Sequence, residues 1–286
     1  MGASGKYRKI AGAPRATFRR RGASLGAETQ KLGCRPVTRA AGARGSPYFY
    51  GPPSLSPRPF MAEKSSIFDM IGPVMIGPSS SHTAGVVRIA RAAIRILGAL
   101  PTEAVVTFYN SFARTYEGHG SDRAIVAGLL GYAPDDIRIR TAFEHAEAAG
   151  LHYTFQSVAN ASTMHPNTIK LNLLDGATGR RVEVIGQSRG GGVIRIVEVD
   201  GFPADFSGSL HTLIIDADDV PGSIAFIASV IAHDQCNIAT MFVSRKGRND
   251  AARQFIEMDS PIKEITLAYL RQLSWVKGIT NIATLD

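Results

Sequence analysis

The chain has 286 residues, 44% of them hydrophobic, and a formal charge of +8. This length permits two domains of ordinary size, each with enough apolar side chains for a packed core. Residues 1–60 hold 12 of the 32 Lys and Arg but one acidic residue, Glu28, so this tail carries +11 and the remainder −3. A basic nucleic-acid surface is therefore not expected on the folded part. No apolar stretch reaches the roughly 18 residues of a membrane span.

Residues 1–60 form a basic tail with Arg19, Arg20 and Arg21 in a row and little sustained apolar periodicity. This composition predicts disorder. A basic, acid-poor leader is also typical of an organellar transit peptide, and clustered Arg can neutralise phosphates as a nucleic-acid arm. Met61 opens the sequence MAEKSSIFDMIGP, which reads like a natural start, so we favour an over-extended gene start. Without a secretory signal or a membrane span, we expect a cytoplasmic protein.

The two cysteines exclude several kinds of site. Cys34 lies in the tail and Cys236 stands alone in an apolar neighbourhood, so a disulfide framework is not expected. An iron–sulfur cluster needs several thiolates and a structural zinc site needs four Cys or His ligands, which the cysteines of this chain cannot supply. We therefore predict no metal ligands in this chain and a buried core position for Cys236.

Helix and strand patterns alternate after Met61. Apolar residues recur with helical spacing over residues 84–97, and Arg88, Arg91 and Arg95 are interspersed. A strand over 104–109 and a helix over 121–130 indicate alternating α/β structure. Short runs rich in β-branched residues, separated by Gly-containing turns at 175–176 and 190–192, follow at 137–139, 152–158, 168–174, 181–185 and 193–199. This pattern predicts a mixed sheet in the central part of the chain, followed by a linker at 201–203.

The pattern from about Leu210 onward reads βαββαβ. Strands are predicted at 212–216, 238–244, 253–258 and 276–284, and helices at 223–233 and 262–273. A unit of this size and order is the split βαβ, or ferredoxin-like, arrangement. We therefore predict an α/β (α+β) fold class, with a mixed-sheet domain over 61–205 and a ferredoxin-like domain over 209–286.

The run GPSSSHT at 77–83 places polar side chains at the start of the first predicted helix. One reading is that Thr83, or a serine before it, simply caps this helix. The other is a site, because the free N–H groups of a first helical turn and the helix dipole attract a small carboxylate. The residues alone leave these readings about equal. The candidate catalytic residues of this loop are Ser79, Ser80, Ser81, His82 and Thr83.

Three further segments carry candidate binding residues. Asn110 and Ser111 follow a strand and His119 precedes a helix, where α/β proteins commonly present ligands, although composition by itself favours a plain turn and a loop residue. His165 and Asn167 flank Pro166 and could either cap a strand entry or bind a small polar ligand. In the last domain, Asp219, Pro221 and Gly222 lie between the first strand and the first helix. They could bind an amino-acid effector, with Asn237 reaching the same site across a domain dimer, or they could form an ordinary helix start capped by an Asp.

Four ordered motifs carry a resemblance to a known family. They are IFDMIGPVMIGPSSSHTAG at 67–85, YNSFARTYEGHGSD at 109–122, MHPNT at 164–168 and SRGGG at 188–192. Together they resemble the β subunit of iron–sulfur L-serine dehydratase over nearly all of residues 61–286. The C-terminal βαββαβ segment is similar to the ACT domain that ends two-chain members. Residues 1–60 have no counterpart in this pattern.

The resemblance implies an L-serine ammonia-lyase that forms pyruvate and ammonia. It also implies a partner α subunit whose cysteines ligate a 4Fe-4S cluster, and a hetero-oligomer with ACT-mediated dimerisation. A cluster iron with an open position would act as a Lewis acid on the serine hydroxyl, while a base removes the α-proton. The 79–83 loop would then hold the substrate carboxylate and hydroxyl, with His82 orienting substrate or transferring protons. The second motif and MHPNT would bind substrate.

Two other functions compete with this reading. A stand-alone amino-acid sensor without catalysis would use the same loops for binding only. A pyridoxal phosphate enzyme performs the same net reaction through a lysine, but no phosphate-cradling loop stands beside Lys170 and the chain is short for such a fold. We therefore expect the serine dehydratase subunit first and the sensor second, with neither nucleic acid nor membrane as a partner.

Overall fold

The computed structural model describes residues 72–161 and 163–285. The predictions of a disordered basic tail, of a start at Met61 and of Cys34 as a tail residue concern positions outside these ranges. Among the described residues, no helix is long and apolar enough to cross a membrane.

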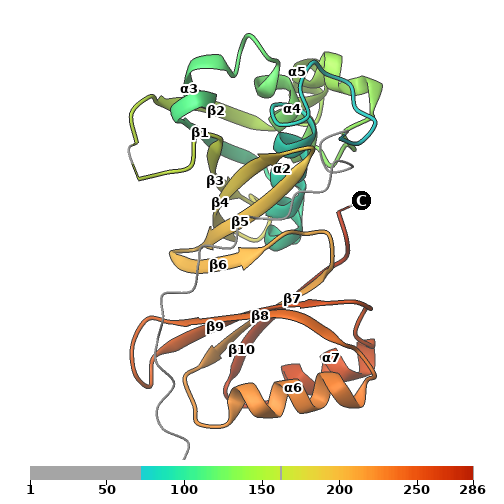
Figure 1. Ribbon diagram of the computed structural model, residues 1–286, viewed down its shortest axis with the longest axis vertical. Coiled ribbons are helices and arrows are strands. Elements are labelled where there is room, and N and C mark those ends of the chain that lie inside the picture. Colours follow the sequence, from blue (N-terminus) through green and yellow to red (C-terminus); the bar gives the residue numbers. More distant parts are fainter. Residues whose placement is uncertain (1–71, 162, 286) are drawn as a thin grey trace, which may run out of the picture. The chain divides into compact units, whose positions relative to one another are not determined.

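A six-stranded mixed sheet forms the first half of the described chain (Figure 1), as the alternating pattern predicts. Its strand order is β2-β1-β3-β4-β5-β6, with β1 and β2 parallel and every other neighbouring pair antiparallel. The strands are β1 (Glu103–Tyr109), β2 (His152–Val158), β3 (Thr168–Leu174), β4 (Arg181–Gly190), β5 (Val193–Val199) and β6 (Phe202–Phe206).

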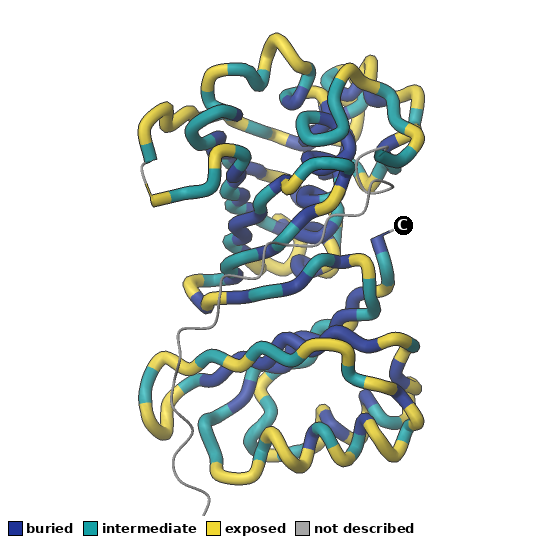
Figure 2. The backbone as a smooth tube through the Cα atoms, in the orientation of Figure 1, coloured by how far each residue is buried: buried dark blue, intermediate teal, exposed yellow. Residues whose placement is uncertain are grey.

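Helix α2 (Ala84–Leu97) packs on β3, β4 and β5, and its apolar residues are buried along its length (Figure 2). The spacing of these residues predicts this helix with its observed bounds. Helix α4 (Ser121–Leu129) packs against α2 at Gly128, where an added Cβ would lie 2.6 Å from the Ala90 Cβ and 2.7 Å from the Val87 carbonyl oxygen. The absence of a side chain at Gly128 therefore allows the two helices to pack closely.

Two sequence predictions in this half are wrong. Residues 137–139 are not a strand but begin a 3-10 helix, η1 (Ile137–Thr141), because the Asp136 carboxylate accepts a hydrogen bond from the Arg138 backbone N–H and starts a turn. Residues 201–203 are not a linker. Asp200 and Gly201 both have positive φ and form a two-residue hairpin turn, which brings β6 into the sheet beside β5.

Two short helices were not expected from the sequence. They are α3 (Asn110–Thr115), which follows β1 directly, and α5 (Ala142–Ala148), which follows η1. Both have fewer than eight residues, which is too short for apolar periodicity to identify them.

The C-terminal βαββαβ unit has the predicted ferredoxin-like topology. Its four antiparallel strands lie in the order β10-β7-β9-β8. Cys236 is 7% exposed and belongs to the apolar core of this unit, which confirms its predicted core position. The elements are β7 (His211–Asp218), α6 (Ser223–His233), β8 (Ile238–Arg245), β9 (Ala251–Met258), α7 (Glu264–Arg271) and β10 (Val276–Ile282).

Buried charged groups join this unit to the end of the first sheet. The Arg253 guanidinium on β9 donates to the Val199 carbonyl at 2.9 Å and to the Asp200 carboxylate at 3.0 Å, and it also pairs with Asp216. Glu257 accepts hydrogen bonds from the backbone N–H and the hydroxyl of Ser207, at 2.9 and 2.8 Å. Contacts with the C-terminal unit therefore hold the chain just before and just after the short strand β6.

Candidate functional site

The imidazole of His82 lies between two hydroxyl groups. Its Nδ1 is 3.2 Å from the Ser79 Oγ, and its Nε2 is 3.1 Å from the Thr115 Oγ1 on α3. The Thr115 hydroxyl donates its hydrogen to the Ser111 carbonyl at 2.9 Å, so its oxygen accepts from His82 Nε2–H. Nδ1 is then the basic nitrogen and faces the Ser79 hydroxyl. His82 and Ser79 thus form a pair that can pass a proton.

The surroundings of His82 favour the neutral imidazole. Burial lowers the pKa of His82 below its ordinary value, and the nearby His119 lowers it further. The rings of these two histidines lie 4.5 Å apart, and the Phe112 ring contacts His82 edge-on at 4.8 Å. The fully buried Ser121 hydroxyl donates to the His82 carbonyl at 3.0 Å and fixes the backbone of this residue. A neutral His82 is available as a proton acceptor near pH 7.

The start of α2 differs from the expected cap. Thr83 stands at the N-cap position, but no side chain caps this helix, so the first of the two readings, a capping hydroxyl from Thr83 or a preceding serine, is wrong. The preceding residues form a turn that takes their place: the Thr83 N–H donates to the Ser79 carbonyl and the Gly85 N–H to the Ser80 carbonyl. Two of the N–H groups expected to be free for a carboxylate are therefore already bonded.

Asn110 and Ser111 hold the loop that carries MHPNT. Asn110 adopts a positive φ, and its side-chain amide donates to the Ala161 and Met164 carbonyls at 2.9 and 3.0 Å while its oxygen accepts from the Ala161 N–H at 2.7 Å. The Ser111 N–H donates to the Pro166 carbonyl at 3.0 Å. The second and third motifs are thus in direct contact.

Ser188 links the remaining motifs. Its N–H donates to the Asn167 carbonyl at 3.0 Å, and its hydroxyl donates to the Ser81 carbonyl at 2.9 Å. Gly85 makes this approach possible, since an added Cβ would lie 2.2 Å from the Ser188 Oγ. The hydrogen bonds therefore close a ring, from His82 through Thr115 and Ser111 to MHPNT, and back through Ser188 to Ser81. All four motifs meet at this motif ring.

The predicted residues take unequal parts in the ring. Ser79 and His82 contribute side chains. Ser81, Ser111 and Asn167 contribute backbone groups, and Ser80 contributes its carbonyl to the helix start. The His165 Nδ1 accepts from the Asn167 N–H at 3.2 Å in a local turn. The three glycines after Arg189 all have positive φ and form the bend between β4 and β5.

Three side chains of the site escaped the sequence prediction. They are the hydroxyls of Thr115, Ser121 and Ser188. Each lies inside a quoted motif, yet nothing in its local pattern separates it from an ordinary helix or strand residue. Their role depends on partners 33, 39 and 107 positions away along the chain.

The predicted effector residues do not come together within this chain. The Asp219 carboxylate accepts from Arg245 Nη1 at 2.8 Å and from the Asn249 N–H at 3.2 Å, while Pro221 and Gly222 are exposed beside it. Gly222, and not an Asp, stands at the N-cap position of α6. Asn237 bonds to Asp259 just before β8 begins, whereas Arg245 ends that strand. Asn237 therefore lies at the other end of β8 from the Asp219 loop.

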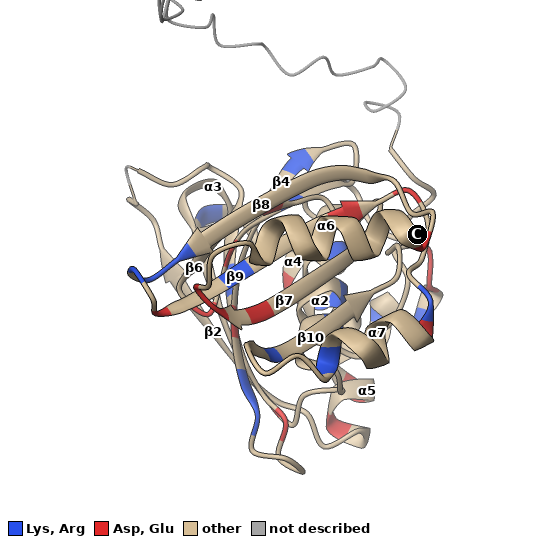
Figure 3. Cartoon of the chain, turned by 90° about the horizontal axis from the view of Figure 1, so that it is seen from below, with Lys and Arg blue, Asp and Glu red and all other residues tan. Residues whose placement is uncertain are grey.

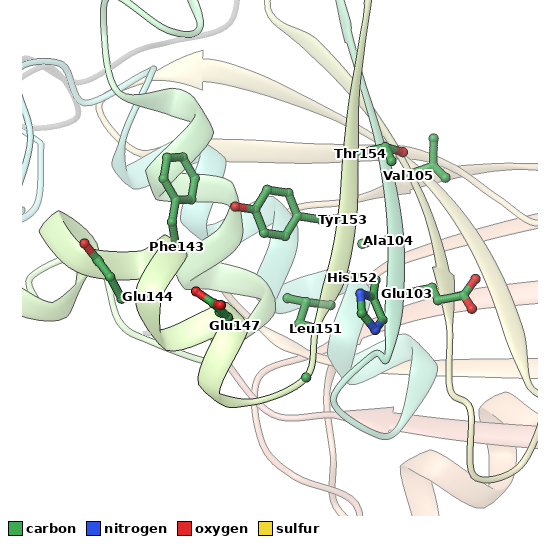
Figure 4. A pocket seen from close by; sticks show the side chains of 11 residues that line it. Glu103, Ala104, Val105, Phe143, Glu144, Glu147, Leu151, His152, Tyr153 and Thr154 are labelled. Carbon is green, nitrogen blue, oxygen red and sulfur yellow. The ribbon is translucent and has the colours of Figure 1, made fainter.

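A separate cavity of about 710 Å³ lies beside strand β2 and contains none of the predicted site residues. Figure 4 shows Glu144 and Glu147 projecting from one helix, with Glu103 and His152 on the neighbouring strands. The rings of Tyr153 and Phe143 stack across it with centroids 5.8 Å apart. This cavity lies on the acidic edge of the sheet and is distinct from the motif ring.

Comparisons with known proteins agree with the four motifs. The model of the serine dehydratase beta chain family matches residues 66–198, which include all four. The probable L-serine dehydratase beta chain of Bacillus subtilis (strain 168) is 44% identical over 218 residues, covering 76% of this chain and 98% of the relative. The L-serine dehydratase beta chain of Peptoniphilus asaccharolyticus is 37% identical over 199 residues, covering 70% and 89%.

A solved structure is also similar to part of this chain. It is the ACT domain from the GTP pyrophosphokinase of Chlorobium tepidum, which is 21% identical and gives a TM-score of 0.20. The match covers 26% of this chain and 96% of that chain.

Proposed function

This chain belongs to the L-serine dehydratase beta-chain family, and we propose that it completes the active site of a 4Fe-4S-dependent L-serine ammonia-lyase. The enzyme converts L-serine to pyruvate and ammonia. The observation that carries the proposal is the motif ring, in which His82 and Ser79 form a proton-passing pair. A ring of hydrogen bonds between segments so distant in sequence holds catalytic groups rigidly, as a site for elimination requires.

The described residues of this chain do not fit a cluster site. Among them, no group of three or more His, Cys, Asp or Glu side chains could hold a metal ion, and Cys236 is buried in the core of the C-terminal unit. We infer that the cluster is ligated mainly or wholly by cysteines of a partner α subunit. The family relatives named beta chains support such a partner.

The residues of the motif ring supply binding and proton transfer. Elimination of water from L-serine requires removal of the α-proton, and a neutral imidazole near pH 7 suits a general base. His82 Nδ1 takes up that proton through the Ser79 hydroxyl, while Thr115 holds Nε2–H and fixes the tautomer. Ser80, Ser81, Thr83, Asn110 and His119 shape the surroundings in which the substrate lies.

The C-terminal unit serves assembly and regulation. Apolar side chains are exposed on its two helices: Ile224, Phe226, Ile265 and Tyr269 are 47%, 37%, 76% and 48% exposed. Helix α6 carries no Lys, Arg, Asp or Glu and is tan along its length in Figure 3. An exposed apolar surface of this kind supports dimerisation. An amino-acid effector binds beside the Asp219–Gly222 loop, which Asn237 reaches only from a second copy. The assembled enzyme resides in the cytoplasm.

The test is anaerobic pyruvate formation from L-serine, measured with this chain by itself and co-purified with a cluster-bearing partner, with cluster absorbance recorded in both samples. We expect activity and the brown colour of a cluster only in the complex. An inactive complex with a verified cluster, together with serine binding by this chain by itself, would contradict the proposal and favour an amino-acid sensor.

A further inference from the structure

A cavity of about 440 Å³ lies beside the motif ring and carries positive charge. Its lining includes Gly77 and Thr83 from the loop before α2, together with His119, Arg123 and Arg140. No Asp or Glu is among the described residues that line it. Arg123 comes from the first turn of α4 and Arg140 from η1, so two separate elements contribute an arginine to the lining of one cavity.

Neither arginine forms a salt bridge among the described residues, although the Asp122 carboxylate interacts electrostatically with Arg123. The Arg123 guanidinium carbon instead lies 5.6 Å from the centre of the Phe143 ring. Nearby, by contrast, Arg138 pairs with Asp136 at 2.5 Å. Two arginines that line one cavity without a salt bridge attract an anion, and a planar guanidinium matches a carboxylate with two parallel hydrogen bonds.

A buried hydroxyl also lacks a partner at this cavity. Thr83 is 1% exposed, and its Oγ1 makes no hydrogen bond in the described structure. Leaving a buried polar group unsatisfied is unfavourable, so such an atom commonly marks a place where another group binds. Gly77 keeps the space next to this hydroxyl clear of a side chain, since an added Cβ would lie 2.1 Å from the Oγ1.

One residue connects the cavity to the His82–Ser79 pair. His119 lines the cavity, and the His119 ring lies 4.5 Å from the His82 ring. A carboxylate held here therefore places the rest of a small amino acid near His82. The start of α2 cannot fill this role fully, because the Thr83 and Gly85 N–H groups already donate to loop carbonyls. The charge that balances a carboxylate has to come from side chains.

We propose that Arg123 and Arg140 bind the α-carboxylate of L-serine in this cavity, with the Thr83 hydroxyl as a further donor. This inference rests on the proposed function and names the residues that recognise the substrate there. It makes the two arginines substrate-binding residues that determine the preference for an amino acid with a free carboxylate.

The first experiment measures L-serine binding and turnover in the complex with the cluster-bearing partner, for Arg123→Ala, Arg140→Ala and the double variant. We expect each single change to raise KM and the calorimetric Kd by about tenfold or more, with kcat little changed. Arg140→Lys keeps the charge but cannot form two parallel hydrogen bonds, so its KM and Kd should lie between those of the wild type and of Arg140→Ala. The control is Arg95→Ala, which removes an exposed arginine of α2 and should change nothing.

A second experiment isolates recognition of the carboxylate. L-Serinamide has no negative charge, so the wild-type complex should bind it more weakly than L-serine, and the double variant should lose this difference. Inorganic phosphate, added as a competitor, tests whether the arginines bind another anion instead. If the double variant loses phosphate binding while its KM for L-serine is unchanged, the proposal is overturned. Unchanged binding of L-serine in correctly folded variants would also overturn it. An inactive wild-type complex whose L-serine binding still depends on the arginines would sink the proposed function but keep this inference.

Discussion

Polar side chains are organised differently in the two sheets of this protein. Around the six-stranded sheet, hydroxyl and imidazole groups bond to partners from distant motifs, and Ser121 and Ser188 are fully buried in doing so. In the C-terminal unit, Asp219 bonds within its own edge of the sheet, and the outer helices expose apolar side chains instead. The first arrangement fits a rigid site for chemistry, and the second fits a surface for contacts.

The largest effect on activity should come from replacing His82, the proton acceptor of the motif ring. His82→Ala removes the proton acceptor, so we expect kcat of the complex for pyruvate formation to fall by about 10²- to 10⁴-fold. The matched control is His152→Ala, which removes an exposed histidine from the separate cavity at β2. Equal activity of the two variants would contradict the assignment of His82.

The next effect tests the contact that joins the two sheets. Arg253→Ala leaves Asp200 and Asp216 without their shared partner, and losing one member of a buried pair is strongly destabilising. Because both carboxylates keep some access to water, we expect the free energy of unfolding to fall by about 3 kcal/mol. Denaturant unfolding measures this change.

Arg245→Ala is the control for that measurement. Its exposed pair with Asp219 should contribute less than about 1 kcal/mol. If both arginine variants lose the same stability, the buried position of Arg253 has no special importance.

A smaller effect compares two glycines. Gly85→Ala pushes a Cβ into Ser188, so we expect a loss of about 1–3 kcal/mol in stability together with reduced activity. Gly222→Ala in the C-terminal unit meets open space and is strained only by its positive φ, at a cost of about 1–2 kcal/mol, with activity kept. The double variant Gly85→Ala, Ser188→Gly should recover part of the stability. Thermal unfolding that shows no recovery would refute the steric explanation.

The smallest effect concerns pH. The pKa of His82 is lowered in the folded protein, so below the ordinary value of 6.5 the unfolded chain binds this proton more readily than the folded one. Stability should therefore fall as pH decreases from 6.5 through the folded pKa, and it should gain nothing from His82 above 6.5. Denaturant unfolding of the wild type and of His82→Gln at several values from pH 7.5 to about 5 gives the slope of the unfolding free energy against pH, and the two proteins should differ in this slope. Identical slopes would exclude the burial of His82 as the cause.

Replacing the neighbouring histidine sharpens the same point. His119→Gln removes the second cause of the lowered pKa but leaves the first, which is burial. The pH dependence of activity should then shift slightly toward higher pH without disappearing. A shift of the profile all the way to the ordinary pKa of 6.5 would mean that the charge of His119, and not burial, lowers the pKa of His82.

Local pattern in the sequence predicts much of this fold. The apolar spacing gives helices α2 and α6 with their observed bounds, and alternating β-branched residues give β2, β3 and β5. Asp200-Gly201 is a hairpin signal, which explains why residues 201–203 are not a linker. The Ile residues of η1 are β-branched, which explains why its sequence resembles a strand. These errors occur where a turn, and not a periodic run, decides the structure.

The sequence by itself determined most of the longer helices and strands, the βαββαβ order of the C-terminal unit and the four motifs, because each depends on residues close together in the chain. Only the tertiary structure decided which of their atoms meet. Ser188 reaches the Ser81 carbonyl across 107 positions, and Thr115 reaches His82 across 33, because the sheet and its short helices bring these segments together. Hydrogen bonds act at about 3 Å, a distance that spacing along the chain cannot predict.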